Sequence, residues 1–224
     1  MNISKVYPKK RKKIIMGVDE VGRGALAGPV YASAVVLLND SLEDISVTLI
    51  KTFKDSKVLS RRKREIIFNK CLKQKVLFGI GYANEPEIDS LNILVASMLA
   101  MVRAVFNCIK KIPSQSQKIH VLFDGVYTPN QILGPWSSNL SAEAIKNGDK
   151  LIPEISCASI IAKVTRDEIM NQAALKYPGF GFHSNSGYGT KQHLAALRIL
   201  GVSSIHRKTF NPIKKLLFHS RDQN

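Results

Sequence analysis

Acidic side chains close three separate apolar stretches of the sequence. Asp19 and Glu20 follow the run IIMGV, Asp124 follows IHVLF, and Asp149 follows AEAIKNG. Strand ends beside glycine turns are where an α/β sheet places its sites, because glycines let a ligand approach the backbone. Four carboxylates converging there would not all stay ionised without a cation, and hard divalent ions prefer such oxygen ligands. These acids therefore predict a divalent-metal site.

The other metal-binding residue types favour Mg²⁺ or Mn²⁺ over zinc at this site. The chain has five histidines, and its three cysteines, Cys71, Cys108 and Cys157, are widely spaced without a CxxC pair. This pattern indicates neither a zinc site nor a disulfide framework, and it is typical of a protein of the reducing cytoplasm. Two such ions could activate an attacking water and stabilise the leaving oxygen of a phosphodiester.

The charge balance indicates a polyanionic partner. Lys and Arg number 33 against 17 Asp and Glu, which gives a formal net charge of +16. Nucleic acid is favoured over a membrane surface, because no uninterrupted apolar run reaches the ~20 residues of a spanning helix. The basic run PKKRKK at residues 8–13 imitates a nuclear-import tract, but we interpret it as a solvated arm resting on phosphates.

Strands and helices alternate along the chain and must position these acids. The expected strands cover residues 14–18, 29–38, 76–83, 119–123 and 142–145. One expected helix covers RRKREIIFNKCLK, directly after the N-cap candidate Ser60. Three further helices are expected over residues 87–111, 153–174 and 191–200. The alternation predicts an α/β sheet covered by helices in a single domain.

A glycine-rich turn at residues 22–27 offers a rival interpretation. Its GRGALA sequence fits the GxGxxA pattern of dinucleotide-binding folds. That pattern requires a helix to follow, with its N-terminus facing the pyrophosphate. Here Pro29 and a strand-like run follow instead, and Asp19 and Glu20 would repel a phosphate unless a metal ion intervened. The dinucleotide interpretation is therefore disfavoured.

Several longer motifs resemble one known family. GVDEVGRGALAGPV at residues 17–30 resembles the opening motif of type 2 ribonuclease H, the bacterial ribonuclease HII. The resemblance continues, in order, through DSKVLSRRKR (55–64), EIDSLNILVASMLAM (87–101), FDG (123–125), NGD (147–149), PEISCASIIAKVTRDEIM (153–170), SGYGTKQH (186–193) and HRKTF (206–210). It covers about residues 14–212 and implies an RNase H-like mixed sheet flanked by helices, with a C-terminal helical extension.

The resemblance implies that Asp19, Glu20, Asp124 and Asp149 are the metal-binding catalytic carboxylates, the same set that the strand ends single out. Asp167 is a tempting fifth acid, but its expected position on a helix beside an arginine favours a structural role. The implied domain organisation is a basic N-terminal arm (1–13), a catalytic domain with C-terminal helices (14–212) and a basic tail (213–224).

Substrate recognition is implied for a second set of residues. By the resemblance, the turn Gly22-Arg23-Gly24 reads the ribose 2′-hydroxyl, and glycines there would bare the backbone for close approach. Tyr188 would pack on the sugar of the following deoxynucleotide, so that the two mark an RNA-to-DNA junction. Lys57, in the DSK motif, is a candidate phosphate contact. His206 and Arg207 could either support the site or touch the nucleic-acid backbone.

Three residues depart from the family pattern. Val126 stands where Asn commonly follows DG, Val58 where a second Lys often follows DSK, and Ser186 where Lys is frequent before GY. The last two departures would weaken phosphate contacts, and Val126 would loosen the support of Asp124. None of them removes an expected metal ligand.

The sequence therefore predicts a metal-dependent endonuclease that hydrolyses the RNA strand of RNA–DNA hybrids, including single ribonucleotides embedded in duplex DNA. Two Mg²⁺ or Mn²⁺ ions would act on the scissile phosphate and leave 3′-hydroxyl and 5′-phosphate ends. We expect a monomeric cytoplasmic enzyme without membrane contact, and contact with a replication clamp stays open. The alternatives are a non-catalytic nucleic-acid-binding protein and a membrane-surface protein; retention of all four acids counts against the first, and the lack of an N-terminal amphipathic helix against the second.

Overall fold

The computed structural model describes residues 13–37, 59–74, 76–113, 118–135 and 140–219. Lys57 and Val58 lie outside these residues, as does the expected N-terminal arm up to residue 12. The division into arm, domain and tail stays a prediction. Ile213–His219 forms helix α11 within the segment expected as the tail, and Ile213 is buried.

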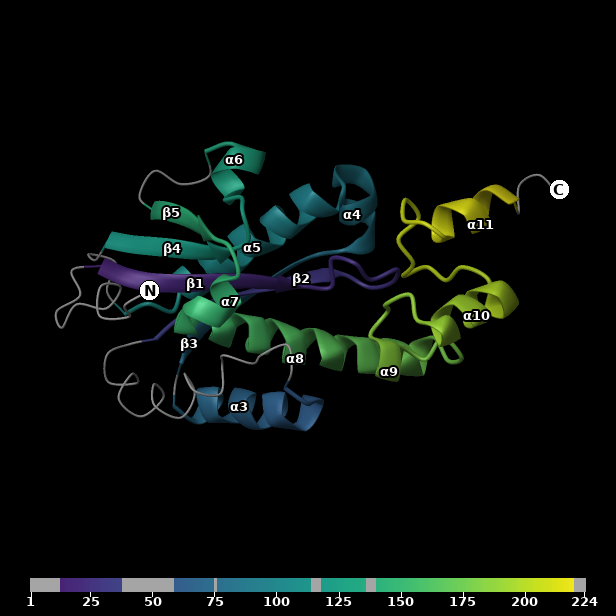
Figure 1. Ribbon diagram of the computed structural model, residues 1–224, viewed down its shortest axis with the longest axis horizontal. Coiled ribbons are helices and arrows are strands. Elements are labelled where there is room, and N and C mark those ends of the chain that lie inside the picture. The colour runs from purple at the N-terminus through teal and green to yellow at the C-terminus, as the bar shows by residue number, and fades with distance from the viewer. Residues whose placement is uncertain (1–12, 38–58, 75, 114–117, 136–139, 220–224) are drawn as a thin grey trace.

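A five-stranded mixed sheet forms the centre of the molecule (Figure 1). Its strands are β1 (Lys13–Val21), β2 (Val30–Val36), β3 (Leu77–Ala83), β4 (Lys118–Asp124) and β5 (Leu140–Ile145), in the spatial order β3-β2-β1-β4-β5. The first three are antiparallel neighbours, whereas β1, β4 and β5 run parallel to one another. The predicted mixed α/β sheet is confirmed.

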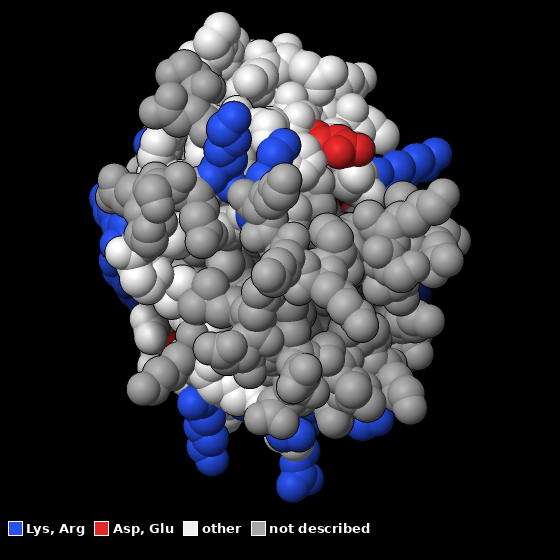
Figure 2. Space-filling view, turned by 90° about the vertical axis from the view of Figure 1, so that its left-hand side faces the viewer, with Lys and Arg blue, Asp and Glu red and all other residues white. Residues whose placement is uncertain are grey.

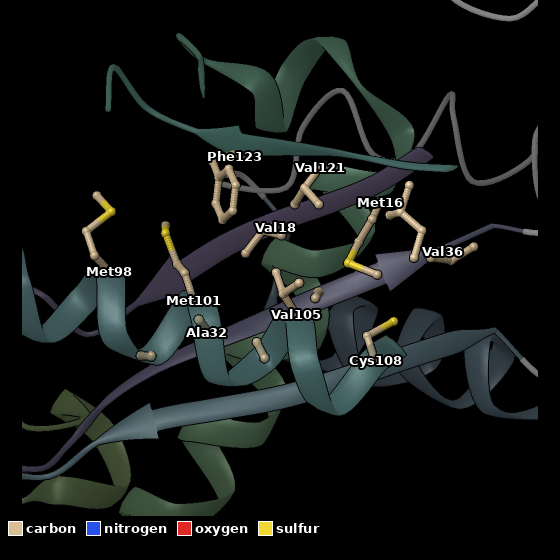
Figure 3. Close-up of a cluster of buried hydrophobic side chains, with 14 of the residues drawn as sticks. Met16, Val18, Ala32, Val36, Met98, Met101, Val105, Cys108, Val121 and Phe123 are labelled. Atoms are coloured by element: carbon tan, nitrogen blue, oxygen red, sulfur yellow. The ribbon is translucent and has the colours of Figure 1, made fainter. Parts of the chain in front are cut away.

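Helices cover both faces of the sheet (Figure 1). On one face, α5 (Ile93–Ile109) packs on the sheet through a core that includes Met16, Val18, Met101 and Phe123 (Figure 3). On the other face, α8 (Pro153–Lys176) crosses β1 and β2, and α3 (Arg61–Lys73) packs outside α8. The alternating side chains of β1 therefore serve two cores, as expected for a strand buried on both faces.

The prediction of a single helix over residues 87–111 is wrong. Two helices occupy this region, α4 (Glu85–Leu91) and α5, and they meet at Asn92, whose backbone has a positive φ of 70° and a ψ of 164°. The Asn92 side chain accepts hydrogen bonds from the backbone N–H groups of Leu94 and Val95 and so caps α5. The apolar period continues through this break because both helices bury their faces in the same core, which conceals the break in the sequence pattern.

Of the remaining helices, one connects β4 to β5, one connects β5 to α8, and the others follow α8. In chain order, the remaining helices are α6 (Pro129–Leu133), α7 (Gly148–Leu151), α9 (Phe182–Asn185), α10 (Lys191–Leu200) and α11. A separate apolar cluster unites α10 and α11 with the end of α8 and with Leu26 and Ala27, which follow β1. The C-terminal segments therefore pack directly against the turn that leaves β1.

Within the described residues, no helix is both long and apolar enough to cross a membrane.

Figure 2 views one end of the molecule, and among its described side chains Lys and Arg project around the margin while acidic groups occupy little of the face. The three cysteines are buried free thiols.

Candidate active site

The ends of β1 and β4 bring the first acids together. These strands are parallel neighbours with Val18 paired to Phe123, so the next residues, Asp19 and Asp124, lie at the same edge of the sheet. Both residues line one cavity of about 300 Å³, here called the acidic pocket. Its lining comprises Asp19, Glu20, Val21, Gly22, Arg23, Gly24, Asp124, Ser159, Lys163 and Tyr188. Three of the four predicted carboxylates and the predicted recognition residues 22–24 and 188 thus share one cavity.

Burial and mutual repulsion disfavour the ionised carboxylates of the acidic pocket. Burial raises the pKa of Asp19 well above its usual value, and the charges of Glu20 and Asp124 raise it further, while a hydrogen bond with Ser159 lowers it. Burial also raises the pKa of Glu20, against the opposing effect of Arg23, whose Nη1 lies 3.1 Å from Glu20 Oε1. A divalent cation would reverse this preference, and an all-oxygen donor set suits a hard ion.

Asp149 lies beside the acidic pocket rather than in its lining. It belongs to α7, after the left-handed Asn147, and is 1% exposed. The backbone N–H groups of Gly148 and Asp149 lie 2.7 and 3.4 Å from Asp124 Oδ1 and donate to it. The expected convergence of four acids is thus present as three acids in one cavity and a fourth adjoining it. Among the described residues, no three His, Cys, Asp or Glu side chains lie close enough together to hold one metal ion in this structure.

Two buried arginines hold the turn that follows β1, residues 22–28, here called the glycine turn. The Arg207 guanidinium donates to the carbonyl oxygens of Gly22, Arg23 and Gly28 at 2.7 to 2.9 Å. Arg166 donates to the carbonyls of Ala27, Pro29 and Ser186 at 2.8 to 3.2 Å. Side chains of both arginines are at most 1% exposed. The open question about Arg207 is therefore answered: it supports the glycine turn.

Tyr188 lies against the glycine turn. Its backbone forms an isolated antiparallel bridge with Ala25, and a Cβ added at Gly24 would lie 3.9 Å from the Tyr188 ring. The Arg166 guanidinium lies 5.5 Å from the ring centroid, within the range of a cation–π contact. Tyr188 as a residue is 37% exposed, and it lines the acidic pocket.

Ser159 and Lys163 are pocket residues that sequence reasoning missed. Both lie on α8, four residues apart and hence on one helix face. Burial lowers the pKa of Lys163, with the nearby charges of Arg64 and Arg166 acting in the same direction. The only signal in the sequence was the placement of two polar residues at helical spacing within the apolar run SCASIIAKV.

Asp167 does not line the acidic pocket, in keeping with the structural role predicted for it. Its carboxylate accepts from the Ser186 hydroxyl at 3.0 Å and lies 3.5 Å from Arg64 Nη2. Ser186, one of the departures from the family pattern, thus holds an acid of α8. Val126, another departure, is 60% exposed.

Comparisons with known proteins place this architecture in a family. The sequence profile described as ribonuclease HII matches residues 16–213. A ribonuclease HII of Pelagibacter ubique is 45% identical over 205 residues, which cover 92% of this chain and 100% of that protein. The crystal structure of ribonuclease H2 from Pyrococcus horikoshii has a TM-score of 0.70 at 25% identity, with 93% of this chain and 99% of the other covered. A Mn²⁺ complex of Bst-RNase HIII shares the fold, with a TM-score of 0.72 at 17% identity over 96% of this chain and 72% of the other. The chain therefore belongs to the ribonuclease HII family of endoribonucleases specific for RNA–DNA hybrids.

Proposed function

We propose that this protein hydrolyses the RNA strand of RNA–DNA hybrids and also cuts at single ribonucleotides embedded in duplex DNA. One observation carries the proposal: the acidic pocket places Asp19, Glu20 and Asp124 within the same cavity as the glycine turn and Tyr188. Groups suited to phosphodiester hydrolysis and groups suited to reading a sugar therefore act on adjacent atoms of one bound strand.

Asp19, Glu20, Asp124 and the adjoining Asp149 would hold the divalent ions, for which Mg²⁺ or Mn²⁺ fits the oxygen donor set. Two such ions, when bound, supply an activated water and neutralise charge on the leaving 3′-oxygen. Backbone N–H groups of residues 148 and 149 donate to one oxygen of Asp124 and so fix the position of this carboxylate at the pocket.

The glycine turn and Tyr188 would select the cut site. Because Gly24 carries no side chain, a ribose can approach the backbone beside the Tyr188 ring. The 2′-hydroxyl is the group that distinguishes RNA from DNA, whereas a deoxyribose lacking it can pack on an aromatic face. Such a pair favours a ribonucleotide followed by a deoxynucleotide.

Cationic groups would hold the phosphates of the nucleic acid in and around the acidic pocket. Lys163 brings an ammonium group into a cavity otherwise dominated by carboxylates, where the phosphate of the bound strand would lie. The net charge of +16 supplies the general attraction for the duplex. Lys57 remains a proposed phosphate contact outside the described residues.

The test is cleavage of a DNA duplex that contains one ribonucleotide, with Mg²⁺ or with EDTA. The wild type should cut only with the metal, and Asp19→Asn and Asp124→Asn should reduce kcat by at least ~10²-fold, the scale of losing a group that stabilises the transition state. Glu168→Gln is the matched control, because Glu168 is an exposed acid of α8 outside the acidic pocket. The proposal is wrong if the wild type does not cut, or if both Asn variants cut as fast as the control.

A further inference from the structure

The glycine turn is the middle of three chain segments that lie side by side. On one side Ala25 bridges to Tyr188, and on the other Ala27 bridges to His206. Backbone hydrogen bonds reinforce both contacts: Leu26 N–H donates to Gly187 O at 2.8 Å, and the Gly28 N–H donates to the carbonyl of residue 205 at 2.9 Å. The positions of Tyr188 and of the segment around His206 are thus linked through the turn.

A second link joins the outer two segments directly. His193, on α10, and His206 place their Nε2 atoms 3.0 Å apart, and the two side chains are 0% and 1% exposed. At the other ends, His193 Nδ1 lies 2.9 Å from the carbonyl oxygen of Tyr188, and His206 Nδ1 lies 3.0 Å from the backbone N of Ser203. The Tyr188 carbonyl, the two histidine rings and the Ser203 backbone N–H thus form one chain of hydrogen bonds.

Only one arrangement of protons satisfies this chain. The Ser203 N–H can only donate, so His206 Nδ1 must accept from it, and the Ser203 hydroxyl 2.7 Å from the same nitrogen then also acts as a donor. The proton of the His206 ring therefore resides on Nε2. His206 Nε2–H then donates to His193 Nε2, which leaves the His193 proton on Nδ1 to donate to the Tyr188 carbonyl. Both rings are neutral in this arrangement.

The surroundings keep the histidine pair neutral. The rings of Phe180 and Phe182 pack against it, with centroids 5.0 Å from His206 and 5.2 Å from His193 respectively. Burial lowers the pKa of His193. Burial, together with the repulsion that a protonated His193 would exert, lowers the pKa of His206 to about 4. The direction of the hydrogen bonds is therefore fixed at neutral pH.

Tyr188 needs such an external restraint. It lies between Gly187, with φ of 81°, and Gly189, so its neighbours restrict the backbone little. Its carbonyl accepts from the Thr190 N–H at 2.8 Å within the same short loop, whereas the bond from His193 ties it to α10 and, through His206, to the far side of the glycine turn.

We propose that His193 and His206 are positioning residues that hold Tyr188 over the glycine turn and thereby set the preference of the enzyme for an RNA-to-DNA junction. The inference rests on the proposed function, in which Tyr188 packs on the deoxyribose that follows the ribonucleotide. Neither histidine lines the acidic pocket, so their effect reaches the substrate through Tyr188.

The test compares kcat/KM on two substrates, a DNA duplex with one embedded ribonucleotide and a hybrid with a continuous RNA strand. The same substitution at the two histidines gives opposite expectations. His193→Gln retains an acceptor for His206 but loses the donor to Tyr188. The kcat/KM on the embedded ribonucleotide divided by that on the continuous hybrid should therefore fall about tenfold, as it should in Tyr188→Ala. His206→Gln retains an N–H for His193 Nε2, so the ratio should stay near that of the wild type.

Two further variants separate positioning from general damage to the fold. His193→Asn places an amide N–H where Nδ1 stood and should restore the substrate ratio. The double variant His193→Gln, Tyr188→Ala should lose no more than Tyr188→Ala alone, because both changes remove the same interaction. Melting temperatures of all variants report on folding separately.

Equal losses on both substrates in His193→Gln, or additive losses in the double variant, would overturn the positioning role. A wild type that cuts the continuous hybrid but not the embedded ribonucleotide would instead overturn the junction specificity in the proposed function, and the inference with it. A wild type that cuts neither substrate would overturn the proposed function as a whole.

Discussion

A single added methyl group should affect Gly22 and Gly24 of the glycine turn differently, lowering the stability of the protein at Gly22 and its activity at Gly24. Gly22 has φ of +91°, and a Cβ there would overlap the Arg166 side chain at Nε. The left-handed backbone costs an alanine about 1–2 kcal/mol, and displacing Arg166 sacrifices its bond to the Pro29 carbonyl, worth about 1.5–3 kcal/mol for a charged donor. Gly22→Ala should therefore lose about 2.5–5 kcal/mol of unfolding free energy, a large part of the ~5–15 kcal/mol typical of a domain.

Gly24 has neither constraint. Its φ lies outside the left-handed region, and the nearest atom to an added Cβ is the Tyr188 ring at 3.9 Å, an ordinary contact. Gly24→Ala should change the unfolding free energy by less than about 1 kcal/mol. The methyl group would nevertheless intrude where a ribose must approach the backbone, so kcat/KM on an embedded ribonucleotide should fall at least ~10-fold.

Urea unfolding followed by far-UV circular dichroism, with Mg²⁺ absent, measures the stability of both variants, and cleavage of the single-ribonucleotide duplex measures their activity. Equal stability of Gly22→Ala and Gly24→Ala would refute the assignment of Gly22 to packing against Arg166. Full activity of Gly24→Ala would refute the close approach of substrate at that position.

Three more predictions concern the supports of the site. Arg207→Lys should lose about 2–4 kcal/mol of unfolding free energy, since one ammonium cannot reach carbonyls on both limbs of the glycine turn, whereas Arg198→Lys at an exposed position of α10 should lose less than ~0.5 kcal/mol in the same urea titration. The folded-state pKa of His206, about 4, lies below the ~6.5 of an unfolded histidine, so the unfolded chain binds the proton first as the pH falls. Acidification from pH 7.5 to 5 should therefore lower the unfolding free energy of the wild type by about 2 kcal/mol more than that of His206→Gln. Equal pH dependence in the two proteins would contradict this prediction. Millimolar Mn²⁺ should raise the melting temperature of the wild type, because a cation relieves the repulsion among the pocket carboxylates, and should raise that of Asp19→Asn less; equal shifts in a thermal melt would argue against binding at Asp19.

The sequence predicted the strands and the acids at their ends because both leave local signals. The apolar run closed by Asp124 marks the end of β4, whereas β1 continues past the expected end at residue 18 to Val21, so Asp19 lies within it. The structure pairs β1 with β4 so that these two acids share a cavity. Asp149 was harder, because three residues separate it from the end of β5 and it belongs to a short helix rather than to a strand end. The break at Asn92 was hidden because hydrophobic periodicity reports burial, which continues across the break, and not helix continuity.

Arg166 and Arg207 could not have been predicted as supports from local pattern. An arginine on a helix or in a loop is usually solvated, and their burial follows from partners 137 and 179 residues away in the chain. The same holds for the His193–His206 contact, which exists only once α10 and the following loop fold back on the glycine turn. Resemblance to the family marked these segments, but their physical role required the three-dimensional arrangement.

This arrangement divides the work of the site between two parts of the chain. Strand β1 carries Asp19 and Glu20 and leads directly into the glycine turn, so a few residues of continuous backbone fix the spacing between the proposed metal ligands and the proposed sugar contact. Tyr188 reaches the same cavity from the C-terminal segments, and its placement depends on contacts with the turn and with His193. Changes in the C-terminal supports should therefore alter which junction is cut before they alter whether hydrolysis occurs, whereas changes in β1 should abolish both together.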